Sequence, residues 1–233
     1  MTSTDSPVDL APELQDPHVL GTDEMAALLR TGTWTRYAGI GDSIVAGIRQ
    51  PAPGYADLSW ADRVAAALRA VNPDLEFRNF AERDLPAARI RATQLEPALA
   101  FRPDIALVVV GGNDLLGRTF DTPAVETEQA RIISALRTRG CTVVTMGLFD
   151  NTWTPYVDDK YKVVMKQRLQ EFSDLTRRVT ERMGGLYVDL PAHPAGREPI
   201  FATDGLHLNA RGHAIVATEV VRKLGAYLAA KQS

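Results

Sequence analysis

The pattern of apolar and polar positions changes its period repeatedly along the chain. Short apolar runs rich in β-favouring residues occur at 36–41, 75–80, 104–110, 142–148 and 186–190. The segments between these runs carry apolar residues at helical spacing, as at Val64, Ala67, Leu68 and Val71. Strands that alternate with helices in this way predict a parallel sheet covered by helices on both faces.

The two ends of the chain differ from this pattern. Residues 1–20 are polar, acidic and interrupted by prolines, which is typical of a disordered or loosely docked leader. A short helix is expected over 23–31, and a last helix over about 209–230 with Asn209 as its N-cap. The rest contains no repeat or second-domain boundary. We therefore expect a flexible acidic leader over 1–20 and a single domain over 21–233.

Polar side chains stand where the predicted strands end. Ser43 follows the first strand, Asn79 closes the second and Asn113 follows the third. Asp204 and His207 lie beyond the fifth strand. Because ligands of open α/β sheets bind outside the carboxyl ends of the strands, the fold is expected to bring these groups to one edge.

The tripeptide Gly41-Asp42-Ser43 suits a serine nucleophile on a tight turn from strand to helix. The helix that begins there would offer backbone N–H groups and a positive dipole end to an oxyanion. The alternative is a plain helix cap formed by Ser or Asp. Glycine-rich phosphate loops are excluded by spacing, because no glycine stands at position 44 and no lysine follows Gly47.

Asp204 and His207 are three positions apart, so one turn can join the carboxylate to the imidazole. In a catalytic triad the acid holds the Nδ1–H of the histidine, so that Nε2 faces the serine. One alternative is a surface loop with an incidental histidine. Another is a metal-binding pair, although no further His, Cys or Asp cluster completes a site. His213 lies in the last predicted helix, where packing or capping is favoured.

Asn113 carries a side-chain amide that can donate a hydrogen bond to a developing oxyanion. Backbone N–H groups of Ser43 and of the loop after the second strand would complete such a hole. The alternative is a Gly-Gly-Asn-Asp turn, in which these residues merely tolerate unusual dihedral angles.

Composition narrows the class of protein. The 233 residues are 45% hydrophobic and carry a formal charge of −3, which gives no basic footprint for nucleic acid. No apolar stretch approaches the roughly 18 residues of a membrane span. Residues 1–29 contain six acids and no Lys or Arg, unlike a secretory signal, so a cytoplasmic location is expected. Cys141 is the only cysteine, which excludes an internal disulfide. The oligomeric state is not indicated.

Together these residues resemble the SGNH hydrolases, the GDSL esterase/lipase superfamily, from about residue 34 to 225. The matching blocks are Gly41-Asp42-Ser43, Gly111-Gly112-Asn113-Asp114 and Asp204-Gly205-Leu206-His207. The resemblance implies a three-layer α/β/α fold with five parallel strands in flavodoxin-like order. It implies Ser43 as nucleophile, His207 as base and Asp204 as the acid that orients it. It also implies an oxyanion hole formed by the Ser43 backbone, the block-two backbone and Asn113.

Block two departs from the family pattern Asn-x-Gly, because Ala81 stands where the glycine is expected. Alanine keeps the backbone N–H that the family uses, but its methyl group needs room and disfavours positive φ. We expect the oxyanion hole to survive and to be narrower on this side. Similar Asn-x-Ala versions occur in actinobacterial members, and 21 Arg against 5 Lys suits a high-GC genome. The chain is therefore identified as an actinobacterial-type member.

Three charged residues, Glu82, Arg83 and Asp84, follow Ala81 directly. They can pair among themselves on the surface, which contributes little stability. Alternatively, Arg83 recognises an anionic or polar group of the substrate, because its planar guanidinium suits a carboxylate or a phosphate.

The segment after the fourth strand contains Trp153 and Tyr156, which are expected either to line a substrate pocket or to pack the loop onto the body. Asp42 and Gly112 are further expected substrate contacts. Because the chain carries no large insertion, we expect a shallow site.

The leading hypothesis is hydrolysis of carboxylic esters of small or medium acyl groups through a Ser43 acyl-enzyme. The expected partner is a small-molecule ester, and no metal or organic cofactor is required. One alternative is an acyltransferase or tailoring enzyme of a biosynthetic pathway, because the same acyl-enzyme can be passed to another acceptor. A non-catalytic binding module on the same scaffold is disfavoured, because Ser43, Asn113, Asp204 and His207 are all present.

Overall fold

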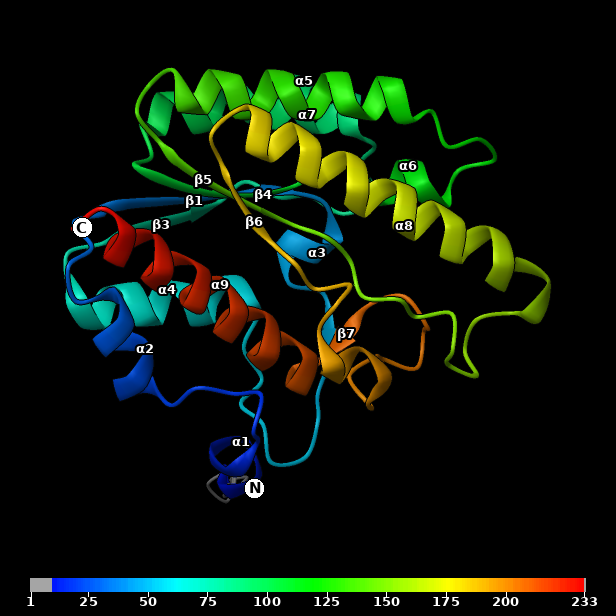
Figure 1. Cartoon of the computed structure of the whole chain (residues 1–233), viewed down its shortest axis with the longest axis horizontal. Helices are drawn as coiled ribbons and strands as arrows, with labels where there is room; N and C mark the ends of the chain where they lie inside the picture. Colours follow the sequence, from blue (N-terminus) through cyan, green and yellow to red (C-terminus); the bar gives the residue numbers. More distant parts are fainter. Residues whose placement is uncertain (1–9, 233) are drawn as a thin grey trace, which may run out of the picture.

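The computed structural model describes residues 10–232 and is built around a five-stranded parallel sheet (Figure 1). The strands are β1 (Arg36–Gly41), β3 (Glu76–Asn79), β4 (Ile105–Val109), β5 (Thr142–Met146) and β6 (Leu186–Val188). Each strand lies inside the apolar run that predicted it. Their order across the sheet is β3-β1-β4-β5-β6, which confirms the expected flavodoxin-like topology.

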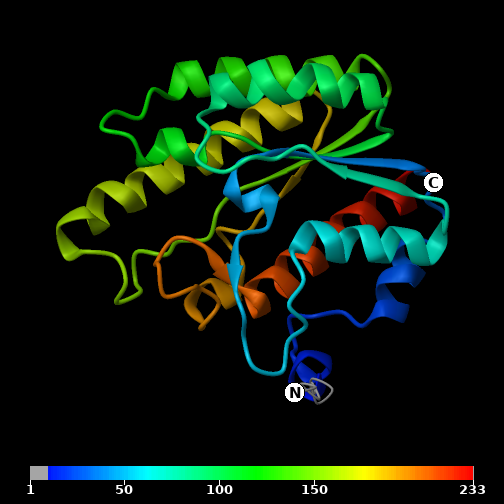
Figure 2. The same cartoon turned by 180° about the vertical axis from the view of Figure 1, so that it is seen from behind.

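Helices cover both faces of the sheet, as Figures 1 and 2 show from opposite sides. One face is covered by α2 (Thr22–Leu29), α4 (Trp60–Val71) and α9 (Ala210–Ala230). The other face is covered by α5 (Ala87–Phe101), α7 (Thr122–Arg137) and α8 (Asp159–Arg182). The shorter helices are α1 (Ala11–Gln15), α3 (Ser43–Ala46), α6 (Gly112–Leu116) and a 3₁₀ turn at Pro194–Arg197. The predicted three-layer α/β/α fold is confirmed.

Strand β4 explains why its apolar run does not alternate. Successive side chains of a strand point to opposite faces of the sheet. Ile105, Leu107 and Val109 pack into the layer that contains α4 and α9. Ala106 and Val108 pack into the opposite layer with α5 and α7. Both faces of this central strand are therefore buried, as the sequence predicted.

The last helix begins as predicted. The side chain of Asn209 accepts a hydrogen bond from the N–H of Gly212 at 3.1 Å, which satisfies one of the free donors at the start of α9. The short helix expected over 23–31 is α2, two residues shorter at its end. Within residues 10–232, no helix has both the length and the apolar character that crossing a membrane requires.

The strand order places a crevice between β1 and β4. The chain leaves β1 for β3 on one side and then returns to β4 on the other side. Helices that follow neighbouring strands diverge at such a switch point, which leaves room for a ligand at the carboxyl ends of the strands. Ser43 follows β1, and Asn113 lies in α6, which follows β4.

A small second sheet closes this edge of the molecule. Strand β2 (Arg49–Gln50) follows α3 and pairs in parallel with β7 (Leu208–Asn209), which follows His207. The side-chain oxygen of Gln50 also accepts hydrogen bonds from the N–H of Thr203 at 2.8 Å and from its hydroxyl at 3.0 Å. The histidine-bearing loop is thereby tied to the segment that follows the serine.

The described part of the acidic leader is docked on the body. Asp16 is buried and accepts hydrogen bonds from the Tyr55 hydroxyl at 2.7 Å and from the Arg211 guanidinium at 2.6 Å. Glu13 receives two hydrogen bonds from Arg63, at 2.6 and 3.0 Å. Acids of residues 10–20 are therefore paired with Arg63 and Arg211 on the body, and the flexible leader over 1–20 stays a prediction. Residues 1–9 lie outside the described part, and the domain boundary at residue 21 stays a prediction.

Candidate active site

Ser43 stands at the point where β1 leaves the sheet and α3 begins. A side chain on Gly41 would come within 2.4 Å of the carbonyl oxygen of Val109 in β4, so the turn requires a glycine there. Asp42 caps α3, because its Oδ1 accepts the N–H of Ile44 at 3.0 Å. The cap of the alternative interpretation is thus Asp42, and Ser43 lies at the start of the helix, where its role as nucleophile stays a prediction.

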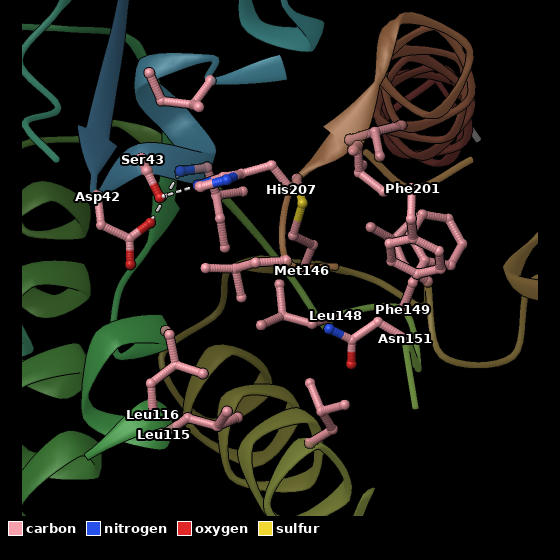
Figure 3. A pocket seen from close by; sticks show the side chains of 18 of the residues that line it. Asp42, Ser43, Leu115, Leu116, Met146, Leu148, Phe149, Asn151, Phe201 and His207 are labelled. Atoms are coloured by element: carbon pink, nitrogen blue, oxygen red, sulfur yellow. Dashed lines mark hydrogen bonds between the residues drawn. The ribbon is translucent and has the colours of Figure 1, made fainter. Parts of the chain in front are cut away.

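Three of the predicted residues meet in a chain of hydrogen bonds. Figure 3 shows the part of it between Ser43 and His207. The Nε2 atom of His207 lies 2.9 Å from the Oγ atom of Ser43. Its Nδ1 atom lies 2.7 Å from Oδ2 of Asp204. Oδ1 of Asp204 accepts the backbone N–H groups of His207 and Leu206, both at 2.9 Å. The carboxylate is therefore held by the loop that it organises.

The charge on Asp204 sets the state of the imidazole. Partial burial opposes ionisation of this carboxyl, but the hydrogen bonds from His207 and Leu206 outweigh it and lower the pKa of Asp204 below its ordinary value. The carboxylate is thus an acceptor at neutral pH, and Nδ1 of His207 carries the hydrogen. The lone pair on Nε2 then faces the hydroxyl of Ser43, as a general base requires.

Asn113 lines the same pocket as Ser43, but its amide already has partners. Its Nδ2 donates to the carbonyl oxygen of Leu85 at 3.2 Å and to Oδ2 of Asp42 at 3.3 Å. Both amide hydrogens are therefore engaged within the protein. The predicted oxyanion donor is in place beside the serine, and it must exchange one of these partners to serve a ligand.

Asp42 is a buried carboxyl at the wall of the pocket, 1% exposed. Burial raises the pKa of Asp42 to about 6, and the N–H of Ile44 limits this rise. The backbone of Gly112 lies so close to Asp42 that a Cβ atom on Gly112 would be 2.9 Å from its Oδ2. Asp42 and Gly112 both line the pocket, where the sequence analysis expected substrate contacts.

Ala81, the third expected oxyanion donor, lies outside the pocket lining. Its N–H donates to Oδ1 of Asn79 at 3.1 Å. The amide of Asn79 in turn donates to the carbonyl oxygen of Val45 in α3 at 2.8 Å, which ties the end of β3 to the helix of the nucleophile. The role of Ala81 as an oxyanion donor stays a prediction.

The pocket beside Ser43 is deeper than expected. Its volume is about 90 Å³, and it reaches fully buried side chains such as Met146 and Val216. Figure 3 shows Met146 and Leu148 beneath His207, with Leu115 and Leu116 on the side of the nucleophile. The expectation of a shallow site is wrong. A pocket of this kind needs no insertion, because it forms between the two helical layers at the end of the sheet.

The charged residues after Ala81 lie apart from this pocket. Glu82, Arg83 and Asp84 are all exposed, and none of them lines it. Within residues 10–232, these three side chains take part in no ion pair, so their expected mutual pairing is absent. A contact between Arg83 and a substrate stays a prediction.

The two aromatic residues after β5 also lie outside the pocket lining. Trp153 donates from Nε1 to the carbonyl oxygen of Gly196 at 2.7 Å, and its ring lies 6.4 Å from that of Phe201 in an edge-on arrangement. Tyr156 is about half exposed and packs against Gly205. For Trp153 these contacts favour the packing alternative of the sequence analysis.

His213 lines the pocket and joins three segments around it. Its Nδ1 accepts the N–H of Trp60 at the start of α4, at 2.9 Å, and its Nε2 faces the carbonyl oxygen of Ile48 at 3.3 Å. Burial lowers the pKa of His213 to about 3, so the ring is neutral. This is the capping role that its sequence position favoured. In residues 10–232, no group of three or more His, Cys, Asp or Glu side chains is arranged to hold a metal ion.

Residues 40–215 match the GDSL-like Lipase/Acylhydrolase family. The chain belongs to this family. The matched segment contains Ser43, Asn113, Asp204 and His207. The hydrogen-bonded residues Ser43, His207 and Asp204 therefore lie within the part of the chain that matches the family.

Solved structures share the fold at low sequence identity. A protein described as a GDSL-like lipase from Parabacteroides merdae is 17% identical, with a TM-score of 0.67 over 82% of this chain and 95% of that one. The acetylxylan esterase Axe2 of Geobacillus stearothermophilus is 20% identical, with a TM-score of 0.67 over 84% and 96%. TesA is 19% identical, with a TM-score of 0.62 over 82% and 98%. No curated protein matches the chain by sequence.

Proposed function

We propose that the protein hydrolyses carboxylic esters through an acyl-enzyme on Ser43. The observation that carries this proposal is the continuous chain of hydrogen bonds from the Ser43 hydroxyl through His207 to Asp204, at the wall of an apolar pocket. Family membership and the acetylxylan esterase among solved structures of the same fold support it. A cytoplasmic location and the actinobacterial-type subgroup remain predictions from the sequence.

Acylation begins with an ester carbonyl carbon above Oγ of Ser43. Nε2 of His207 takes the hydroxyl proton while the C–O bond forms, and Asp204 stabilises the imidazolium that results. The carbonyl oxygen becomes an oxyanion. Collapse of this intermediate breaks the bond to the alcohol oxygen, which leaves with the proton from Nε2 of His207.

Deacylation repeats these steps with water as the nucleophile. His207 removes a proton from water, the hydroxide adds to the acyl carbon, and the second oxyanion collapses with expulsion of Ser43. The serine recovers its proton from His207, and the free acid leaves. The protein itself supplies every group that this sequence of steps uses.

The oxyanion is assigned to Asn113, with backbone N–H groups of Ser43 and Ala81 as further proposed donors. Asn113 currently donates to Asp42 at 3.3 Å, a long hydrogen bond that a developing negative charge can replace. A small rotation of the amide, with its bond to Leu85 kept, would direct that hydrogen to the ligand.

A fluorophosphonate probe tests the nucleophile directly. The purified wild-type protein should be labelled at Ser43 in stoichiometric amounts and should lose its turnover of 4-nitrophenyl esters. Ser43→Ala should be neither labelled nor active, with a melting temperature within a few degrees of wild type. Labelling of Ser43→Ala, or full turnover by it, would reject the proposal. Thr93→Ala, on the exposed side of α5, is the control and should be labelled and active like the wild type. Ser59 is unsuitable for this purpose because its side chain caps α4.

A further inference from the structure

The pocket beside Ser43 has a closed end and an open end. Its floor includes Met146, Leu190 and Val216, each at most 2% exposed. Its mouth is bordered by Leu116 and Leu206, which are 40% and 45% exposed. A ligand that enters beside the nucleophile therefore runs into the protein, between the sheet and its covering helices, rather than across the surface.

The walls between mouth and floor are mostly apolar. Leu115 of α6 and Met165 and Leu169 of α8 contribute one side, and Leu148 stands between them and His207 (Figure 3). The polar side chains of the triad and of Asn113 gather at the nucleophile. Asp42, Asn151 and His213 are the other polar residues of the lining. Nδ2 of Asn151 donates to the carbonyl oxygen of Gly205 at 2.6 Å, while its Oδ1 is buried without a partner among residues 10–232.

This lining excludes some substrates. A sugar that entered it would bury more hydroxyl groups than the few polar atoms of the lining can pair with, and each unpaired hydroxyl costs on the order of 1–3 kcal/mol. An alkyl chain would gain from the same surface. This lining favours an alkyl chain over a sugar, whereas Axe2, which shares the fold, is an acetylxylan esterase.

The two halves of an ester make different demands on a blind pocket. The alcohol takes its proton from His207 and must leave in every turnover before water can attack. The acyl group stays on Ser43 until deacylation. A closed pocket therefore suits the acyl half, and the open mouth suits the departing alcohol.

We infer that this pocket is an acyl site, and that the preferred substrates are esters of unbranched aliphatic acids of about six to eight carbons. The inference rests on the proposed function and adds the substrate class. A volume of about 90 Å³ has room for roughly six to nine groups the size of a water molecule. Each methylene that enters should raise kcat/KM by roughly two- to fourfold until the floor is reached.

A series of 4-nitrophenyl esters from acetate to laurate tests the length limit, because the leaving group is constant. We expect kcat/KM to rise from two carbons to about six to eight and to fall beyond ten, with substrates kept below their micellar concentrations. A second series keeps an octanoyl group and varies the alcohol from methyl to hexyl, where we expect changes below threefold.

Two leucines of nearly equal exposure, Leu116 and Leu28, provide the matched variants. Leu116→Trp should narrow the mouth and reduce octanoate turnover at least tenfold while changing acetate turnover less than threefold. Leu28→Trp, in α2 and 41% exposed, should change neither. Met146→Ala, at the floor, should move the optimum to longer chains.

The outcomes separate this inference from the function on which it rests. A flat acyl-length profile with turnover that still requires Ser43 would overturn the acyl site alone. A rise along the alcohol series instead would place the alcohol in the pocket and would also overturn it. Absence of Ser43-dependent turnover on every ester would reject the proposed function itself.

Discussion

The two halves of the candidate site differ in whether their functional groups already bond to one another in the free protein. On the triad side, Ser43, His207 and Asp204 bond to one another, at 2.9 and 2.7 Å. On the oxyanion side, Asn113 donates to Asp42 and Leu85. The proton-transfer chain is assembled in the free protein, whereas two of the expected oxyanion donors, the Asn113 amide and the Ala81 N–H, have other partners.

This difference has a physical reason. The triad members satisfy one another, so they can be assembled without a ligand. A donor that serves only a transient oxyanion would otherwise stand unpaired, and a buried unpaired donor costs on the order of 1–3 kcal/mol. Asn113 avoids this cost through two long hydrogen bonds that are easily exchanged. Variants on the two sides should therefore fail in different ways.

The largest effect is expected from Asp204→Asn. The new amide can donate to Nδ1 of His207, which moves the ring hydrogen to Nε2 and removes the base that faces Ser43. We expect kcat to fall by about 10³- to 10⁴-fold. The fold should be kept, because the remaining oxygen can still accept the N–H groups of Leu206 and His207. Steady-state kinetics and thermal melting measure both effects.

A matched control is Asp189→Asn. Asp189 is 42% exposed at its side chain and pairs with Arg177 at 2.9 Å, so it resembles Asp204 in exposure but lies outside the site. We expect less than a twofold change in kcat. A loss below tenfold for Asp204→Asn would mean that the imidazole does not depend on this carboxylate.

Asn113→Ala tests the other half. Loss of one oxyanion donor should lower kcat by about 10²- to 10³-fold with little change in KM. Asn72→Ala is the control, because Asn72 is also half-buried and donates from its amide to the carbonyl oxygen of Trp34 at 3.1 Å. That variant should lower the melting temperature and leave kcat within twofold. Wild-type kcat in Asn113→Ala would remove Asn113 from the hole.

The triad half was predictable from sequence for a local reason. Asp204 and His207 lie in one turn, and Ser43 follows a strand whose apolar run marks where it ends. Pairing of β2 with β7, which holds the two segments together, leaves no such signal, because two residues are too few to show a period. Only the folded chain reveals that Gln50 reaches Thr203.

The pocket was not predictable, because its depth depends on packing between distant segments. Met146, Leu190 and Val216 come from the end of β5, the segment after β6 and the middle of α9. Each is an ordinary core residue in the sequence pattern. The gap that they leave is set by the distance between layers, and sequence periodicity carries no information about that distance. The partners of Asn113 were hidden for a similar reason, since one of them is a backbone carbonyl, that of Leu85.

A smaller effect is expected from Asp42→Asn, which sharpens the comparison at the point where the halves meet. The variant keeps an acceptor for the N–H of Ile44 but loses the carboxylate beside Asn113. We expect kcat/KM to fall by about tenfold, because the new amide nitrogen at position 42 would face the amide nitrogen of Asn113, and both are donors. Asp42→Ala should also lose the helix cap and melt earlier, which Asp42→Asn should not.

The same variant tests how pH acts on stability. Burial raises the pKa of Asp42 from 3.8 to about 6, and His207 and Asp114 are the titratable groups that act on it. The folded protein therefore binds this proton more tightly than the unfolded chain. The unfolding free energy of the wild type should fall relative to Asp42→Asn as pH rises from about 4 to about 6, by up to about 3 kcal/mol. Denaturant titrations at four pH values measure the difference. A constant difference would show that Asp42 ionises normally.

The smallest effect is expected from Ala81→Gly, which restores the residue of the family pattern. Both residues present the same backbone N–H, so the donor to Asn79, and to a proposed oxyanion, is kept. We expect kcat/KM to change by less than about threefold, and stability to fall by about 0.4–1 kcal/mol because glycine has more freedom in the unfolded chain. A tenfold rise in kcat for bulky acyl esters would instead mean that the methyl group of Ala81 obstructs the hole. In that case the shape of the hole, rather than the exchange of partners at Asn113, would limit kcat. Ala81→Gly and Asn113→Ala together distinguish these two causes.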